Sequence, residues 1–165
     1  MTREIAKAED AQGLIWRISL ADVDADGPFS RFGGLTRILT VIAGEGIDLV
    51  SPESVIAARW GSPVRFSGEI PVIGRLKNGP IRDLNLIFDT TRVNMDVLLL
   101  SGPTTIATGP GLTGCFVLAG AVRIDGLPLS DGEFGLGQAG QIELDPDAKA
   151  LWLTIRERPG SQNRL

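Results

Sequence analysis

The chain has 165 residues, with 16 Lys and Arg against 20 Asp and Glu, for a formal net charge of -4. The basic residues are scattered, so no patch favours binding to a nucleic-acid backbone. A single cysteine, Cys115, excludes an internal disulfide and a zinc site of several thiolates, and the absence of histidine excludes Ser-His-Asp catalysis and the commonest transition-metal ligand.

The first fifteen residues, MTREIAKAEDAQGLI, contain no apolar core of signal-peptide length. We expect two short helical pieces: one at residues 5–12, and a turn near residues 52–58. No run of about 18 apolar residues, as a membrane-spanning helix requires, occurs along the chain. We therefore expect a soluble, cytoplasmic protein that makes no membrane contact.

The rest of the chain is predicted to be β structure. Pairs of turn-forming residues recur at short intervals, which leaves little room for a long helix, and the 21 glycines fit many tight turns. Between the turns, apolar residues alternate with polar ones, as on strands with one buried face. The alternating positions are Trp16, Ile18 and Leu20 near the start and Ile142, Leu144, Leu151, Leu153 and Ile155 near the end.

A weak internal repeat indicates two related halves. TVIAGEGIDL (40–49) and FVLAGAVRID (116–125) each place an apolar strand before Ala-Gly and then resume a strand. The second copy continues as strands separated by turns, which is typical of half a jelly roll. We expect two β-barrels, one near residues 16–90 and one near 93–157, with Gly44 and Gly120 in equivalent turns.

Residues 135–140 read GLGQAG, the G-x-G-x-x-G spacing of a dinucleotide-binding loop, and Glu157 follows its last glycine by seventeen residues. Such a loop needs a helix that begins there and whose N-terminus holds the pyrophosphate. The residues that follow, 141–144, alternate with period two instead. We interpret these glycines as parts of tight β turns and expect no nucleotide to bind.

Two segments resemble the HutD/Ves family of RmlC-like cupin-fold proteins. They are WRISLADVDADGPFSRFGGLTRILTVIAGEG (16–46) and GPIRDLNLIFD (79–89). The residues that match the family's pattern are Trp16, Arg17, Ser19, Gly27, Pro28, Phe29, Ser30, Arg37, Gly79, Pro80, Asp83 and Asn85. In other members, a Lys-Asn-Gly-Gly-Gly element comes just before a Thr-x-Glu-Ile segment. This chain begins with Met-Thr-Arg-Glu-Ile, without that element.

The resemblance implies an all-β bicupin, with two cupin-like β-barrels in one unit over residues 1–165. It also implies that the usual cupin metal and any other cofactor are absent. The carboxylates, amides and carbonyls that remain as ligands suit calcium or magnesium better than iron, copper or zinc. We therefore expect no transition metal.

The resemblance further implies a role in bacterial histidine utilisation. The protein would bind a small acidic intermediate such as formylglutamate and tune the pathway without catalysing a step. Two alternatives stay open: an isomerase or hydrolase that uses Asp83 or Glu69 as a general base, and a protein-interaction module with a vestigial pocket. The expected partner is the acidic metabolite, and we expect no binding to nucleic acid. A homodimer is an open alternative.

The candidate site centres on Asp83 and Asn85 in IRDLNLIFD. They are two residues apart, so on a strand they point to the same face. A carboxylate inside a barrel needs a partner, for which Arg37 is our first choice and Arg17 the second.

Two interpretations of this cluster are open. In the binding interpretation, Arg37 holds a ligand carboxylate, Asn85 contacts a formyl or amide group, and Asp83 holds the arginine in place. Ser19, Phe29 and Ser30 are further candidate ligand contacts. The alternative is a structural Arg–Asp–Asn network that closes the barrel.

Overall fold

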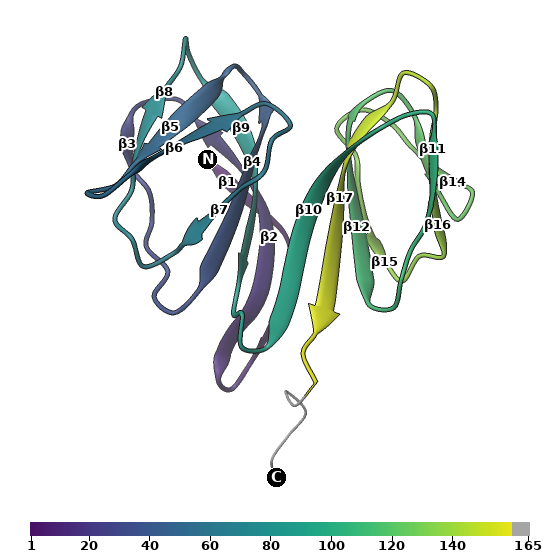
Figure 1. Ribbon diagram of the computed structural model, residues 1–165, viewed down its shortest axis with the longest axis horizontal. Helices are drawn as coiled ribbons and strands as arrows, with labels where there is room; N and C mark the ends of the chain where they lie inside the picture. Colours follow the sequence, from purple (N-terminus) through teal and green to yellow (C-terminus); the bar gives the residue numbers. More distant parts are fainter. Residues whose placement is uncertain (160–165) are drawn as a thin grey trace. The chain divides into compact units, whose positions relative to one another are not determined.

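The computed structural model describes residues 1–159, which form strands, turns and loops without a helix (Figure 1). The strands are β1 Thr2–Asp10, β2 Gly13–Val23, β3 Gly27–Pro28, β4 Thr36–Ala43, β5 Gly46–Val50, β6 Val55–Arg59, β7 Val64–Ser67, β8 Ile73–Leu76, β9 Ile81–Phe88, β10 Val93–Ser101, β11 Thr104–Ala107, β12 Leu112–Ala119, β13 Val122–Ile124, β14 Leu127–Leu129, β15 Phe134–Gly137, β16 Gln141–Leu144 and β17 Lys149–Glu157. The prediction of an all-β protein is confirmed. No helix in this part of the chain is long and apolar enough to cross a membrane.

The chain divides into two compact units, Met1–Val93 and Asn94–Leu165. The first unit has one sheet in the order β1-β2-β9-β4-β7 and another in the order β3-β8-β5-β6. The second unit has sheets in the orders β10-β17-β12-β15 and β11-β16-β13-β14. Each unit is therefore a pair of sheets in which most neighbouring strands are not consecutive in the sequence, as in a jelly roll.

The two units repeat one topology. Adding eight to every strand number of β2-β9-β4-β7 and β3-β8-β5-β6 gives the two sheets of the second unit, and β1 is the additional strand. The sequence repeat falls on equivalent turns: Gly44 follows β4 with φ 86°, and Gly120 follows β12 with φ 76°. Strands β4 and β12 also each have a register irregularity shortly before this glycine. The repeat is therefore structural and not an accident of composition.

Both predicted helical pieces are wrong. Residues 5–12 lie mostly in β1, which pairs antiparallel with β2, and residues 52–58 lie partly in β6, which pairs with β5. A helix this short is marginal by itself, whereas a neighbouring strand supplies a partner for every second backbone group. Strand pairing therefore overrides the local helix preference of Ala, Glu and Lys in residues 4–9.

The GLGQAG segment is β structure. Residues Phe134–Gly137 form β15, Gln141–Leu144 form β16, and a loop joins them. A Cβ on Gly135 would lie 3.0 Å from Leu129 and 3.1 Å from Ile124, so this glycine permits close approach of side chains. The expected absence of the nucleotide-binding helix is confirmed, and the absence of nucleotide binding stays a prediction.

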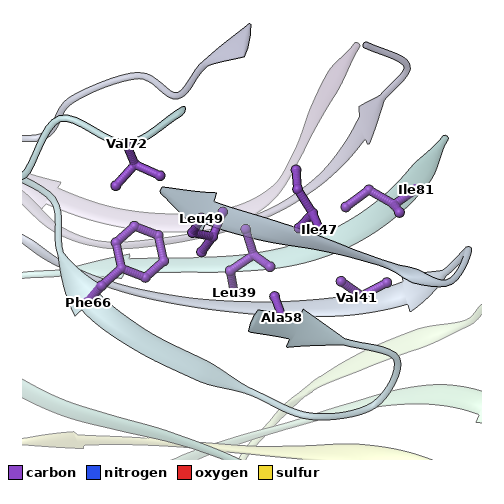
Figure 2. Packing of buried hydrophobic residues seen from close by; sticks show 8 residues of the cluster. All are labelled: Leu39, Val41, Ile47, Leu49, Ala58, Phe66, Val72 and Ile81. Carbon is purple, nitrogen blue, oxygen red and sulfur yellow. The ribbon is translucent and has the colours of Figure 1, made fainter. Parts of the chain in front are cut away.

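The core of the first unit lies between its two sheets. Side chains from β4, β7 and β9 meet side chains from β5 and β6 (Figure 2). The cluster consists of Leu39, Val41, Ile47, Leu49, Ala58, Phe66, Val72 and Ile81. Burial of each large apolar side chain contributes roughly 1.5–3 kcal/mol, so this cluster fixes how the two sheets face each other.

The second unit has a corresponding apolar cluster. It consists of Cys115, Val117, Val122, Ile142, Leu144, Ala148 and Ala150. Burial raises the pKa of the Cys115 thiol to about 12, so the thiol stays protonated. Cys115 is a core residue, as its apolar sequence context indicates.

Alanine substitutions at the two repeated glycines should destabilise the protein. A Cβ at Gly44 would overlap the carbonyl oxygen of Pro80, and one at Gly120 would lie 2.9 Å from the Cα of Ala148. Positive φ adds to the cost for any residue with a Cβ. We expect Gly44→Ala and Gly120→Ala each to lower the free energy of unfolding by about 1–3 kcal/mol in urea denaturation.

Gly33→Ala is the matched control, because a Cβ there would meet nothing within 4 Å. Its effect should stay within about 0.5 kcal/mol. Equal stability of all three variants would contradict the constraint that we assign to these turns.

Candidate functional site

A pocket of about 320 Å³ lies in the first unit. Its walls come from β2, β4, β9 and the loop that follows β3. All seven site residues predicted from the sequence line it: Arg17, Ser19, Phe29, Ser30, Arg37, Asp83 and Asn85. The structure thus brings these residues together, and their contact with a ligand stays a prediction.

Strand β9 organises the pocket because it lies between β2 and β4. Asp83, Asn85 and Ile87 alternate along it and share one face. The register places Ser19 of β2 opposite Asn85, and it places Arg17 and Arg37 on either side of Ile87. Residues far apart in the sequence therefore converge on one sheet face.

Arg37 is held by two hydrogen bonds. Its Nη2 donates to Oδ1 of Asn85 at 2.9 Å, and its Nη1 donates to the carbonyl oxygen of Ser30 at 3.2 Å. The Nδ2 of Asn85 in turn donates to Oδ1 of Asp83. The chain of contacts therefore runs from Asp83 through Asn85 to Arg37.

This arrangement corrects the expectation that Asp83 holds Arg37 directly. On β9, Asp83 is paired with Val41, whereas Arg37 is paired with Ile87, four residues further along. Four residues of extended strand span about 13 Å, so the carboxylate is displaced from the guanidinium. Asn85 lies between them and bridges the distance.

Aromatic rings surround the guanidinium of Arg37. Its Cζ lies 5.3 Å from the ring centroid of Phe29, 5.4 Å from that of Phe32 and 5.2 Å from that of Phe66. Arg37 is only 5% exposed. Burial lowers its pKa to about 10, with the charge of Asp83 acting in the opposite direction, so Arg37 stays positively charged at neutral pH.

Asp83 is fully buried. Burial raises the pKa of its carboxyl group to about 7, although the charge of Arg37 and the hydrogen bond from Asn85 both act to lower it. The protonated and ionised forms of Asp83 are therefore both populated near neutral pH.

Three pocket side chains have buried atoms without a hydrogen-bond partner among the described residues. These atoms are the Nε of Arg17, the Nε of Arg37 and the Oδ2 of Asp83. Buried polar atoms in folded proteins are usually satisfied, so such atoms in a pocket indicate positions that a bound molecule or water would fill. Chemically, they offer two donors for an anion and one carboxyl oxygen.

The sequence interpretation missed Phe32 and Thr2, which also line the pocket. Phe32 lies three residues after Phe29 in the same loop, and this spacing was a usable signal. Thr2 belongs to β1, which pairs with β2, and the sequence interpretation predicted no strand there.

Glu69 lies outside the pocket lining. It ties down the loop instead, because its Oε1 accepts from the backbone N–H of Gly34 and its carbonyl oxygen accepts from Nε of Arg31, both at 3.0 Å. Of the two candidate bases, only Asp83 lies in the pocket.

No group of three or more His, Cys, Asp or Glu side chains suited to hold a metal ion occurs within residues 1–159. The expectation that no transition metal binds stays a prediction, which elemental analysis of untagged protein can check.

Comparison with known sequences finds a match to the HutD family over residues 1–155. An uncharacterized 21.2 kDa protein from the hutC 3' region of Pseudomonas putida is 31% identical over 134 residues, which cover 74% of this chain and 66% of that protein. The protein Ves of Escherichia fergusonii is 35% identical over 96 residues, which cover 56% of this chain and 49% of Ves. The chain thus spans just under two thirds of the first relative and about half of the second.

Solved structures show the same fold. HutD from Pseudomonas fluorescens SBW25, described as a formate condition, has a TM-score of 0.82 and 28% identity, with 96% of this chain and 89% of HutD covered. A cupin 2 conserved barrel protein from Leptotrichia buccalis has a TM-score of 0.63 at 13% identity, with 96% of this chain and 88% of that chain covered, which shows the fold alone. The predicted cupin-type fold is confirmed.

Asp83→Asn should change how stability depends on pH. The native pKa of Asp83 is raised from 3.8 to about 7, so the native state holds this proton more tightly than the unfolded state does. The stabilisation is therefore fully present below about pH 4 and is lost as pH rises through 7. Between these limits, the free energy of unfolding of the wild type should fall by about 4 kcal/mol relative to Asp83→Asn.

Urea denaturation at a series of pH values measures this difference. Asp22→Asn serves as a control of opposite sign, because the hydrogen bond from Arg82 lowers the pKa of Asp22. A difference between wild type and Asp83→Asn that does not vary with pH would contradict the raised pKa.

Proposed function

This chain belongs to the HutD family, and we propose that its first unit binds a small acidic metabolite of histidine utilisation, of the formylglutamate type, in a cytoplasmic regulatory role. The observation that supports the proposal most strongly is Arg37, a buried cation in the pocket wall whose Nε lacks an acceptor. An anionic ligand would supply that acceptor.

Arg37 retains the geometry for a carboxylate. A guanidinium has five N–H donors, and Arg37 uses one on Nη1 and one on Nη2. In a guanidinium, the Nε–H and one Nη2–H lie on one edge of the planar group, which matches the two oxygens of a carboxylate. Asn85 and Ser30 orient Arg37 and leave its Nε without a partner on this edge.

The free Oδ2 of Asp83 suggests a second contact. When ionised, this oxygen accepts a hydrogen bond, for which the formylamide N–H of a formylglutamate-type ligand is a suitable donor. Both the oxygen and the nitrogen of the Asn85 side-chain amide already make hydrogen bonds. We therefore assign Asn85 to positioning Arg37 and Asp83, and we assign the ligand contacts to those two residues.

The link to histidine utilisation rests on the relatives. The matching family is HutD, and the Pseudomonas putida relative is described by its position beside hutC. The pocket keeps an open volume beside Arg37, Asp83 and Asn85, which supports ligand binding over the interaction-module alternative.

An enzyme that uses Asp83 is the second candidate. A carboxyl group with a pKa of about 7 is matched to general-base chemistry at neutral pH. Proton NMR of formylglutamate incubated with the protein distinguishes the two candidates. An unchanged ligand supports the binding role, and release of formate favours a hydrolase.

Arg37→Lys should weaken binding although the positive charge is kept, because an ammonium cannot reproduce the paired donors of the guanidinium. Loss of a charge-assisted hydrogen bond costs about 1.5–3 kcal/mol, or roughly ten- to hundredfold in Kd. Calorimetric titration with formylglutamate, glutamate and formate measures this, on protein shown to be folded by circular dichroism.

Arg75→Lys is the control, because Arg75 is exposed and pairs with Asp26 outside the pocket lining. It should bind as the wild type does. Equal affinity of Arg37→Lys and wild type would remove Arg37 from the site, and no binding by the wild type would refute the proposed function.

A further inference from the structure

We propose that Arg17 is a specificity-determining residue of this pocket: together with Arg37, it selects ligands with two carboxylates over otherwise identical ligands with one. The inference rests on the proposed function, because it assumes that Arg37 holds a first carboxylate. It adds that the ligand carries two carboxylates and that Arg17 binds the second of them.

The two arginines reach the pocket from opposite sides of β9. Arg17 on β2 and Arg37 on β4 are both paired with Ile87, so one strand separates their backbones by about 10 Å. Their side chains converge, because the Cζ of Arg17 lies 5.1 Å and that of Arg37 lies 5.4 Å from the centroid of the Phe32 ring. Two cations therefore flank a single aromatic side chain.

Neither cation forms a salt bridge among residues 1–159, although the charge of Asp83 acts on Arg37. Other arginines of this unit do pair with aspartates: Arg59 with Asp48, Arg75 with Asp26, Arg82 with Asp22 and Arg92 with Asp10. Burial is the main cause that lowers the pKa of Arg37, the charge of Asp83 opposes it, and the like charge of Arg17 lowers the pKa further.

Of the acidic side chains in the pocket, Asp83 interacts with Arg37 through its charge, and no acidic pocket side chain forms an ion pair with Arg17 within residues 1–159. Asp22 is bonded to Arg82 at 2.7 Å, Asp83 accepts from Asn85, and Asp24 is exposed. The two positive charges repel each other, and anions beside them would relieve that repulsion.

Arg17 also has donors to spare. Its Nε is buried without a hydrogen-bond partner within the described part of the chain. The unpartnered Nε side of Arg37 serves one carboxylate, so a second carboxylate on the same ligand would be bound by Arg17. Contact with Phe32 keeps both guanidinium groups in place.

The test compares glutarate with its monoamide, in which an uncharged amide replaces one carboxylate at nearly constant size. By calorimetric titration, wild type should bind glutarate at least tenfold more tightly than the monoamide. Arg17→Gln should abolish this preference while leaving the affinity for the monoamide within about threefold. Lys7→Gln is the matched control, because Lys7 is an exposed cation paired with Arg17 across β1 and β2, and it should keep the preference.

Equal affinity of wild type for the two ligands would overturn the inference, and this comparison does not depend on the folding of any variant. An equal loss of affinity for both ligands in Arg17→Gln would also overturn it, since the two arginines would then share one carboxylate. Failure of the proposed function gives a different result, in which wild type binds neither ligand nor formate.

Discussion

The first unit must accommodate a permanent cation inside an apolar barrel. Removal of the Arg37 guanidinium from water costs several kcal/mol. This cost is offset by the hydrogen bonds to Asn85 and Ser30 and by the rings of Phe29, Phe32 and Phe66. The loop that carries Phe29, Ser30 and Phe32 is anchored in turn, for example by the hydrogen bond from the backbone N–H of Phe32 to the carbonyl oxygen of Gly68 at 2.7 Å. Hydrogen bonds and aromatic contacts from several elements of the unit therefore stabilise the Arg37 guanidinium.

The topological repeat shows that the second unit lacks this site. With the register of β12 against β17 aligned to that of β4 against β9, Thr113 takes the position of Arg37, Ala150 that of Asp83 and Trp152 that of Asn85. Ala150 belongs to the apolar core of that unit, and Trp152 packs against it. At these positions the second unit therefore has an alanine of its apolar cluster and a tryptophan packed against that cluster, where the first unit has the Asp83 and Asn85 of the pocket.

The sequence predicted which residues line the pocket better than it predicted the edges of the fold. Period-two alternation was enough to place Asp83 and Asn85 on one face, and the family pattern selected Arg37. The order of contacts, from Asp83 through Asn85 to Arg37, could not be predicted from the sequence. It depends on the register of β4 against β9, which no local pattern encodes. For the same reason β1 was mistaken for a helix: its residues favour a helix locally, and only pairing with β2 makes them a strand.

The central claim is that the free edge of Arg37 receives a ligand carboxylate. A crystal structure of the complex with formylglutamate tests this most directly. We expect a carboxylate of the ligand to accept hydrogen bonds from the Nε and Nη2 of Arg37 while Asn85 keeps its bond to the same guanidinium. A ligand bound elsewhere, or an Arg37 Nε still without an acceptor in the complex, would contradict the account.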